Sequence, residues 1–222
     1  MVRIIDQSYK IITDLNGLVI LKNIELAART CYKSEHLITE DGESAKKLVK
    51  KLVGLRHTAM LEFGGNIHVR IICNRGLTHE LVRHRLCSFA QESTRYCDYT
   101  NVKHSRELTV IRPIGFRCLD NENWDEKERK INIQFEIWKY AMEKAESCYF
   151  RLRGQGVSPQ VARGVLPIDT KTEINISANP TEWRHIFRLR TSKAAHPQIR
   201  EIMLNLLRDF RAEILYIFDE LI

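Results

Sequence analysis

Residues Arg83 to Cys97 read RHRLCSFAQESTRYC and form the most informative stretch of the chain. Three basic residues stand side by side at its start, and Ser93 and Arg95 follow after a short spacer. A soluble domain rarely needs such a density of fixed anion-binding donors for folding alone. Guanidinium groups also match phosphate groups in a planar, bidentate way. The stretch therefore indicates a site for small, phosphorylated, negatively charged molecules.

Length and charge limit the class of protein. The 222 residues are long enough for one sizeable domain. The formal net charge of +7 favours anionic partners, either a nucleic acid or a small phosphorylated ligand. The sequence has no basic tail and no basic stripe interleaved with aromatic residues, so we expect no nucleic acid as partner. No apolar run approaches the length of a membrane span, so we expect no membrane contact.

The sequence offers no familiar metal or dinucleotide motif. Residues 79–83 read HELVR, but Arg83 stands where the zinc-binding pattern HExxH needs its second histidine, so we expect no metal site. There is no GxGxxG and no P-loop pattern. The cysteines form no CxxC pair, and without a signal peptide we expect free thiols in a reducing cytoplasm. They are Cys31, Cys73, Cys87, Cys97, Cys118 and Cys148.

The hydrophobic periodicity predicts a single α/β (α+β) domain over residues 1–222, with a mixed or antiparallel sheet flanked by helices. Strands are predicted over residues 2–12, 66–73, 108–111 and 172–178. Helices are predicted over residues 23–34, 43–55, 77–86, 123–153, 158–166, 180–190 and 197–221.

The basic cluster is predicted to lie on the helix over residues 77–86. Because residues three and four apart share a helix face, Glu80, Arg83, His84 and Cys87 would line one side, and Arg85 would point away. The three consecutive residues would then face more than one ligand, or a pocket shared with another subunit. The alternative is a solvated basic face on which Glu80 pairs with Arg83 or His84.

Ser93 has three possible roles. A serine nucleophile needs a base and an oxyanion hole, and the chain has no GxSxG pattern. A hydroxyl between basic residues is better suited to donate to a phosphate oxygen, with Arg95 as a bidentate partner. The alternative is a serine that only stabilises a turn. Taken alone, Arg163 and Arg190 would be ordinary cations at helix ends. Taken alone, Asn179 is most simply an N-cap, and His185 is more often a structural histidine than a catalytic one.

The arrangement RHR, seven residues, then serine resembles the signature of the flavin-dependent thymidylate synthases. Five flanking segments resemble this family in the same order along the chain. They are AARTCYKS at 27–34, RHTAMLEF at 56–63, VARGVLP at 161–167, NPTEWRHIFRLR at 179–190 and AHPQIR at 195–200.

The resemblance implies an activity and an assembly. Enzymes of this family make dTMP from dUMP, with 5,10-methylenetetrahydrofolate as carbon donor, NADPH as reductant and FAD as redox cofactor. They are homotetramers of a mixed α/β fold, and several subunits contribute to each active site. We therefore expect a cytoplasmic methyltransferase of this kind.

The resemblance also implies roles for individual residues. Arg190 would be catalytic, because it would face the uracil carbonyl side and favour a pyrimidine that is deprotonated at N3. Ser93 and Arg95 would hold the dUMP phosphate. The residues expected to bind FAD are His57, Ala59, Arg83, His84, Arg85, Gln91, Asn179, Pro180, Thr181 and His185. Those expected to bind dUMP are Glu80, Leu81, Val82, Arg83, Gln91, Glu92, Ser93, Thr94, Arg95, Arg163 and Arg190.

The segment at 56–63 departs from the family pattern. Ala59, Met60 and Phe63 stand where the family often has a hydroxyl residue, a proline and a final histidine. One alternative is therefore a family member that binds flavin and nucleotide but has lost the folate reaction. The other is a colourless, basic nucleic-acid-binding module, which the +7 charge supports.

Overall fold

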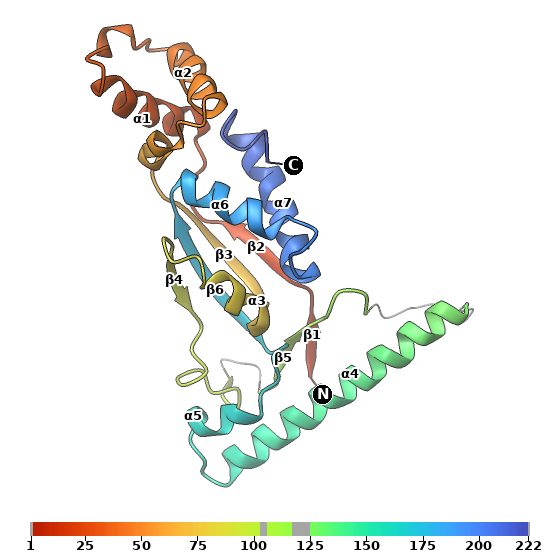
Figure 1. Cartoon of the computed structure of the whole chain (residues 1–222). Coiled ribbons are helices and arrows are strands. Elements are labelled where there is room, and N and C mark those ends of the chain that lie inside the picture. Colours follow the sequence, from red (N-terminus) through yellow and green to blue (C-terminus); the bar gives the residue numbers. More distant parts are fainter. Residues whose placement is uncertain (1, 103–105, 117–124, 222) are drawn as a thin grey trace. The chain divides into compact units, whose positions relative to one another are not determined.

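The computed structural model describes residues 2–102, 106–116 and 125–221. Cys118 and the first two residues of the helix predicted over 123–153 lie outside this part. The chain, whose labelled helices and strands are drawn in Figure 1, forms two compact units, and four of the five boundaries between their segments fall within strands. The first comprises Met1–Ser8, Ile72–Leu81 and Ala90–Ile174, and the second Tyr9–Ile71, Val82–Phe89 and Asn175–Ile222. The single domain over 1–222 stays a prediction.

The strands form a pair and a four-stranded sheet. The pair joins β1 (Arg3–Ile5) to β5 (Thr109–Ile111) in parallel, and Val110 also forms an antiparallel bridge with Thr170. The sheet has the order β2-β3-β6-β4. Its strands are β2 (Ser8–Ile11), β3 (Ile67–Asn74), β6 (Lys171–Ala178) and β4 (Ser88–Gln91). The predicted mixed α/β architecture is confirmed.

One predicted strand is divided in the structure, and one strand of the structure was not predicted. The strand predicted over residues 2–12 is divided into β1 and β2, because the chain leaves the first pairing at Asp6 and Gln7 before it enters the sheet. β4 was not predicted, because its four residues are too few to establish a period-2 pattern. By contrast, the predicted strand at 172–178 is present as β6, in which buried and half-buried residues alternate.

Most predicted helices are present. They are α1 (Gly17–Thr30), α2 (Glu43–Gly54), α3 (Arg75–Leu81), α4 (Glu126–Gly154), α5 (Pro159–Ala162), α6 (Pro180–Arg190) and α7 (Pro197–Glu213), with 3-10 turns η1 (Glu35–Leu37), η2 (Thr58–Gly64) and η4 (Arg163–Val165). α1 begins earlier than predicted because the Asn16 side chain accepts from the Val19 backbone N–H. α7 ends before residue 221 because Ile214 takes an extended conformation. No described helix has the length and apolar character needed to cross a membrane.

The helix predicted over residues 77–86 is wrong at its C-terminal end. α3 ends at Leu81, and residues 82–87 form turns. The chain turns here because it enters β4, which lies next to β6 in the sheet. The predicted helix face of Glu80, Arg83, His84 and Cys87 therefore does not exist beyond Glu80, and Arg85 does not lie on the opposite face of a helix.

An aromatic cluster holds α6 in the second unit. Trp183 and Phe187 of α6 are fully buried against Phe210 of α7, with ring centroids 5.1 and 5.3 Å from that ring. Phe218 closes the cluster at 5.3 Å from Phe210. The Trp183 Nε1–H also donates to the Ile67 carbonyl of β3 at 3.1 Å. The cluster therefore fixes the helix that carries several predicted site residues.

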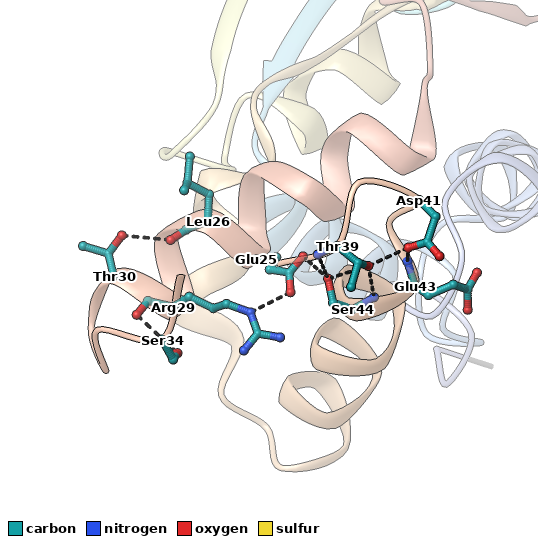
Figure 2. Close-up of polar contacts among 9 residues, drawn as sticks. All are labelled: Glu25, Leu26, Arg29, Thr30, Ser34, Thr39, Asp41, Glu43 and Ser44. Atoms are coloured by element: carbon teal, nitrogen blue, oxygen red, sulfur yellow. Dashed lines mark hydrogen bonds and ion pairs between the residues drawn. The ribbon is translucent and has the colours of Figure 1, made fainter. Parts of the chain in front are cut away.

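A buried carboxylate joins α1 to α2 in the same unit. The Glu25 side chain accepts from Arg29 Nε at 2.7 Å and from Ser44 Oγ at 2.9 Å (Figure 2). Thr39 and Asp41 extend this network to the first turn of α2, where Asp41 accepts from the Glu43 backbone N–H at 3.0 Å. Because the buried charge is paired and fully hydrogen-bonded, it fixes the connection between the two helices.

A second ion pair fixes the chain that follows Ser93 in the first unit. Asp98 Oδ2 lies 2.7 Å from Arg153 Nη2 at the end of α4, and Asp98 Oδ1 accepts from the Thr100 hydroxyl at 2.8 Å. The Arg153 hydrogen bond, together with those from Thr100, holds the pKa of the Asp98 carboxyl well below its usual range. Tyr149 packs beside it within the buried core of this unit.

We predict that Phe187→Ala lowers the free energy of unfolding by about 3–5 kcal/mol, because it removes a buried ring and leaves a cavity. Urea unfolding followed by circular dichroism measures this loss. Leu189→Ala on the same helix is the control, since Leu189 is 47% exposed. An equal effect of the two substitutions would contradict the role given to the aromatic cluster.

We predict that Asp98→Asn lowers the free energy of unfolding by about 2–4 kcal/mol at pH 7, because it leaves Arg153 Nη2 without its ionic partner. The folded-state pKa of Asp98 lies below its unfolded value, so this stabilisation is complete above about pH 5 and is lost progressively as the pH falls further. Unfolding curves of both proteins between pH 7 and pH 3 measure it. A difference that stays constant over this range would contradict the assignment.

Candidate functional site

The predicted site residues fall into two groups that follow the two units. All residues expected to bind FAD lie in the second unit except Gln91. All residues expected to bind dUMP lie in the first unit except Val82, Arg83 and Arg190. The structure thus brings most residues of each predicted set into one unit.

The turn after α3 separates the three basic residues of the motif. The side chain of His84 is buried, with 3% of the residue exposed, whereas Arg83 and Arg85 are exposed. The three residues therefore differ in burial: His84 faces the interior of the unit, and the two arginines face its surface. The side chains of Arg83 and Arg85 point away from that of His84 because the segment is a turn and not a helix.

His84 contacts three residues of α6. Arg190 Nε donates to His84 Nε2 at 3.1 Å, and Glu182 Oε1 lies 3.6 Å from His84 Nδ1. The His185 ring lies edge-on to His84 with a centroid distance of 5.5 Å. Burial, followed by the charges of Arg190 and His185, lowers the pKa of His84 to about 4. The imidazole is therefore neutral at pH 7, and the 3.6 Å contact with Glu182 is not an ion pair there.

The hydrogen bond from Arg190 assigns the tautomer of His84. A neutral imidazole has one N–H and one lone pair, and the lone pair on Nε2 accepts from Arg190. The proton is therefore on Nδ1, on the side of Glu182. His84, Glu182 and His185 lie close enough together to ligate a metal ion. In this tautomer, however, Nδ1 has no lone pair for a metal, so the arrangement favours the hydrogen-bonded state.

The start of α6 lies beside the segment that contains His57 and Ala59. Asn179 caps the helix, since its Oδ1 accepts from the Glu182 backbone N–H at 2.9 Å. Thr181 Oγ1 donates to the Thr58 carbonyl at 2.9 Å. A Cβ on Gly64 would lie 2.8 Å from the Pro180 ring, so only glycine allows this close approach. The helix N-terminus and the exposed His57 therefore form one local surface.

In the first unit, Gln91 and Glu92 form hydrogen bonds with residues of α3 and β6. Gln91 Nε2 donates to the hydroxyls of Thr78 and Thr172 at 3.1 and 3.3 Å. Glu92 accepts from Lys171 Nζ at 3.0 Å, and its backbone N–H donates to the Glu173 carbonyl at 2.9 Å. These bonds fix the end of β4 immediately before Ser93.

Ser93 to Arg95 form a turn to which Arg163 is bound. The Ser93 hydroxyl accepts from the Arg95 backbone N–H at 3.3 Å, which is the turn-stabilising contact considered above. Arg163 Nη1 donates to the Thr94 hydroxyl at 3.2 Å. The Arg95 guanidinium is exposed above the Tyr96 ring, with its Cζ 5.4 Å from the centroid. The turn therefore gathers two guanidinium groups and a hydroxyl, a set that suits a phosphate group.

Three of the residues expected to bind dUMP lie at the end of α3 and just beyond it. Leu81 is fully buried in the core, so only its backbone is available to a ligand. Glu80 is half-buried, and Val82 is exposed.

Sequence reasoning missed Glu182 and gave Cys87 no role. The Cys87 thiol donates to Glu182 Oε1 at 3.9 Å, and burial, with the nearby Glu182 charge, raises the pKa of this thiol to about 12. The sequence shows Glu182 only as part of the polar start of a helix. Its burial next to His84 depends on tertiary packing, which no local pattern reveals.

Comparisons with known proteins agree over most of the chain. The family model described as thymidylate synthase complementing protein matches residues 20–214. The flavin-dependent thymidylate synthase of Corynebacterium glutamicum is 31% identical over 215 residues, which cover 94% of this chain and 81% of that protein. The enzyme of the same name from Pyrococcus furiosus is 32% identical over 166 residues, which cover 74% of this chain but only 62% of that protein.

A solved structure shows the same fold. The UMP/dUMP methylase PolB from Streptomyces cacaoi, crystallised with 5-Br dUMP, has a TM-score of 0.76 at 20% sequence identity. The similarity covers 98% of this chain and 96% of that one. Because the family model and the relatives agree with the motif, the chain belongs to the family of flavin-dependent thymidylate synthases.

Proposed function

We propose that the chain catalyses the reductive methylation of dUMP to dTMP, with 5,10-methylenetetrahydrofolate as carbon donor and NADPH as reductant. Family membership supports this activity, and the crystallised relative was bound to a dUMP analogue. The observation that carries the proposal within this chain is the hydrogen bond from Arg190 to the buried, neutral His84. This bond holds the Arg190 guanidinium, which is partly buried, in one orientation.

The residues of the second unit fit FAD. Arg83 and Arg85 are exposed guanidinium groups, and the positive end of the α6 dipole lies near the exposed His57. A dinucleotide carries a pyrophosphate, which such donors bind well. We propose that these residues hold FAD together with Ala59, His84, Gln91, Asn179, Pro180, Thr181 and His185. FAD would supply redox chemistry that side chains cannot provide.

The turn in the first unit is proposed to hold the nucleotide. Ser93 and Arg95 would bind the dUMP phosphate, with Arg163 beside them and the backbone from Gln91 onward adding donors. Arg190 would lie against the pyrimidine, where a cation stabilises the ionised ring and raises the electron density at carbon 5. Ser93 then binds substrate and does not need to attack carbon 6.

Assembly as a homotetramer with shared active sites is part of the same proposal. α4 exposes Ile133, Ile137 and Tyr140 at spacings of four and three residues, with exposed fractions of 60–66%. An exposed apolar stripe on one helix face fits burial against another subunit. Five cysteines are free thiols in the described part of the chain, which fits the proposed cytoplasmic location. Sedimentation of the purified protein measures the assembly.

A family member without the folate reaction is the second candidate. Ala59 lacks the hydroxyl that the family pattern often has there, and Phe63 is 57% exposed in place of a histidine. The deciding experiment uses purified protein with dUMP, 5,10-methylenetetrahydrofolate and NADPH. Thymidylate formation supports the proposed function. A flavin spectrum with dUMP binding but no thymidylate supports the second candidate, and a colourless protein that binds DNA contradicts both.

We predict that Ser93→Ala raises the Kd for dUMP about 10- to 150-fold while turnover continues at saturating dUMP. A hydrogen bond to a charged phosphate contributes about 1.5–3 kcal/mol, which corresponds to that range. Isothermal titration and initial rates measure the two effects. Ser88→Ala, an exposed serine on β4, is the control. Complete loss of turnover with intact dUMP binding would instead indicate a nucleophilic serine.

We predict that Arg190→Ala lowers kcat by one and a half to three decades, or about 2–4 kcal/mol, while FAD stays bound. The physical reason is the loss of the cation that stabilises the ionised pyrimidine. Steady-state kinetics and the flavin absorbance of the purified variant provide the two readouts. Arg188→Ala is the matched control, since Arg188 lies on the same helix but pairs with Glu220 at the surface. Near-normal dTMP formation by Arg190→Ala would rule out the role of Arg190.

A further inference from the structure

Glu182 is a buried acid that the proposed chemistry does not use. Its side chain is only 8% exposed, and its Oε1 lies 3.6 Å from His84 Nδ1. The second neighbour of this carboxylate is the Cys87 thiol, which is a neutral donor because burial raises its pKa to about 12. Burying a carboxylate away from water is costly, so its persistence beside an imidazole calls for an explanation.

The backbone fixes where this carboxylate sits. Glu182 is the third residue of α6, and its N–H donates to the capping Asn179 side chain at 2.9 Å. The neighbouring Trp183 is locked into the aromatic cluster. The position of Glu182 is therefore set by the helix and not by His84, so the carboxylate is able to impose an orientation on the imidazole.

The opposite side of the imidazole is equally defined. His84 Nε2 accepts from Arg190 Nε at 3.1 Å, and this bond requires Nε2 to carry no proton. If the proton moved from Nδ1 to Nε2, the imidazole would present an N–H to a guanidinium N–H, and the hydrogen bond would be lost. The orientation of Arg190 therefore depends on the tautomer of His84.

We propose that Glu182 is a positioning residue, which keeps the His84 proton on Nδ1 and so leaves Nε2 to orient the Arg190 guanidinium. One part of this inference, the effect of Glu182 on kcat through Arg190, rests on the proposed function. The tautomer itself is independent of the reaction. Glu182 acts through His84 and touches no substrate atom.

The first test is the tautomer of His84 in the FAD-loaded protein. Long-range proton–nitrogen NMR of 15N-histidine-labelled protein distinguishes a protonated Nδ1 from a protonated Nε2, and His84→Gln identifies the His84 signals. We expect Nδ1 to carry the proton in the unsubstituted chain. A proton on Nε2 overturns the proposal, whatever the variants do.

The second test compares three changes at acidic positions. Glu182→Leu removes the carboxylate oxygen that lies 3.6 Å from Nδ1, so we expect a substantial Nε2-protonated population and a fall in kcat of about tenfold to a hundredfold with flavin content unchanged. Glu182→Gln keeps an electronegative oxygen that can face the Nδ1 proton, and we expect it to restore the tautomer and most of kcat. Glu213→Leu, at an exposed position, should leave both readouts unchanged.

A double-mutant cycle with Arg190→Ala separates positioning from a merely structural effect. If Glu182 acts through Arg190, Glu182→Leu causes no further fall in kcat once Arg190 is replaced. The proposal is overturned if the falls in kcat caused by the two substitutions multiply in the double variant. It is also overturned if the Glu182→Leu protein keeps the proton on Nδ1 and its kcat stays within about twofold. If the unsubstituted protein makes no dTMP, the proposed function fails, and the NMR measurement still decides the role of Glu182.

Discussion

The burial of one face of α6 is the constraint on which the second unit depends. Trp183 and Phe187 occupy the aromatic cluster with Phe210, and the cap at Asn179 fixes where the helix begins. These two restraints fix the rotation of the helix about its own axis, and so the direction in which each polar residue leaves it. The distances from His84 to Glu182, His185 and Arg190 therefore follow from apolar packing several residues away.

His84 is uncharged at pH 7 although it lies in a motif of basic residues. Burial disfavours protonation of the imidazole, and the neighbouring guanidinium group adds to that effect. The pKa of His84 falls to about 4 for these reasons, in spite of the nearby Glu182 carboxylate. A neutral histidine is thereby available as a hydrogen-bond acceptor at physiological pH, which a protonated one is not. The proposed role of Arg190 depends on that acceptor.

Local signals in the sequence were sufficient where a helix or strand carries its own period and caps. The cap at Asn179, the buried alternation of β6 and the long amphipathic α4 were all predicted close to their observed bounds. The turn at residues 82–87 was not, because the leucines before it continue a helical spacing. What ends α3 is the entry of a four-residue strand into the sheet, and such non-local pairing leaves almost no local pattern. The burial of Glu182 was invisible for the same reason.

The same turn changes how the charge of the RHR motif is to be understood. Counted in the sequence, the motif offers three cationic or imidazole groups in a row, which would make a dense anion-binding patch. In the structure the middle residue is buried and uncharged at pH 7, so only Arg83 and Arg85 present positive charge to the surface. His84 instead directs its one lone pair at Arg190 on α6. In the proposed site, the motif would therefore combine two functions in three residues. Its outer arginines would supply charge for an anionic ligand, and its histidine would fix the direction of a cation supplied from elsewhere in the chain.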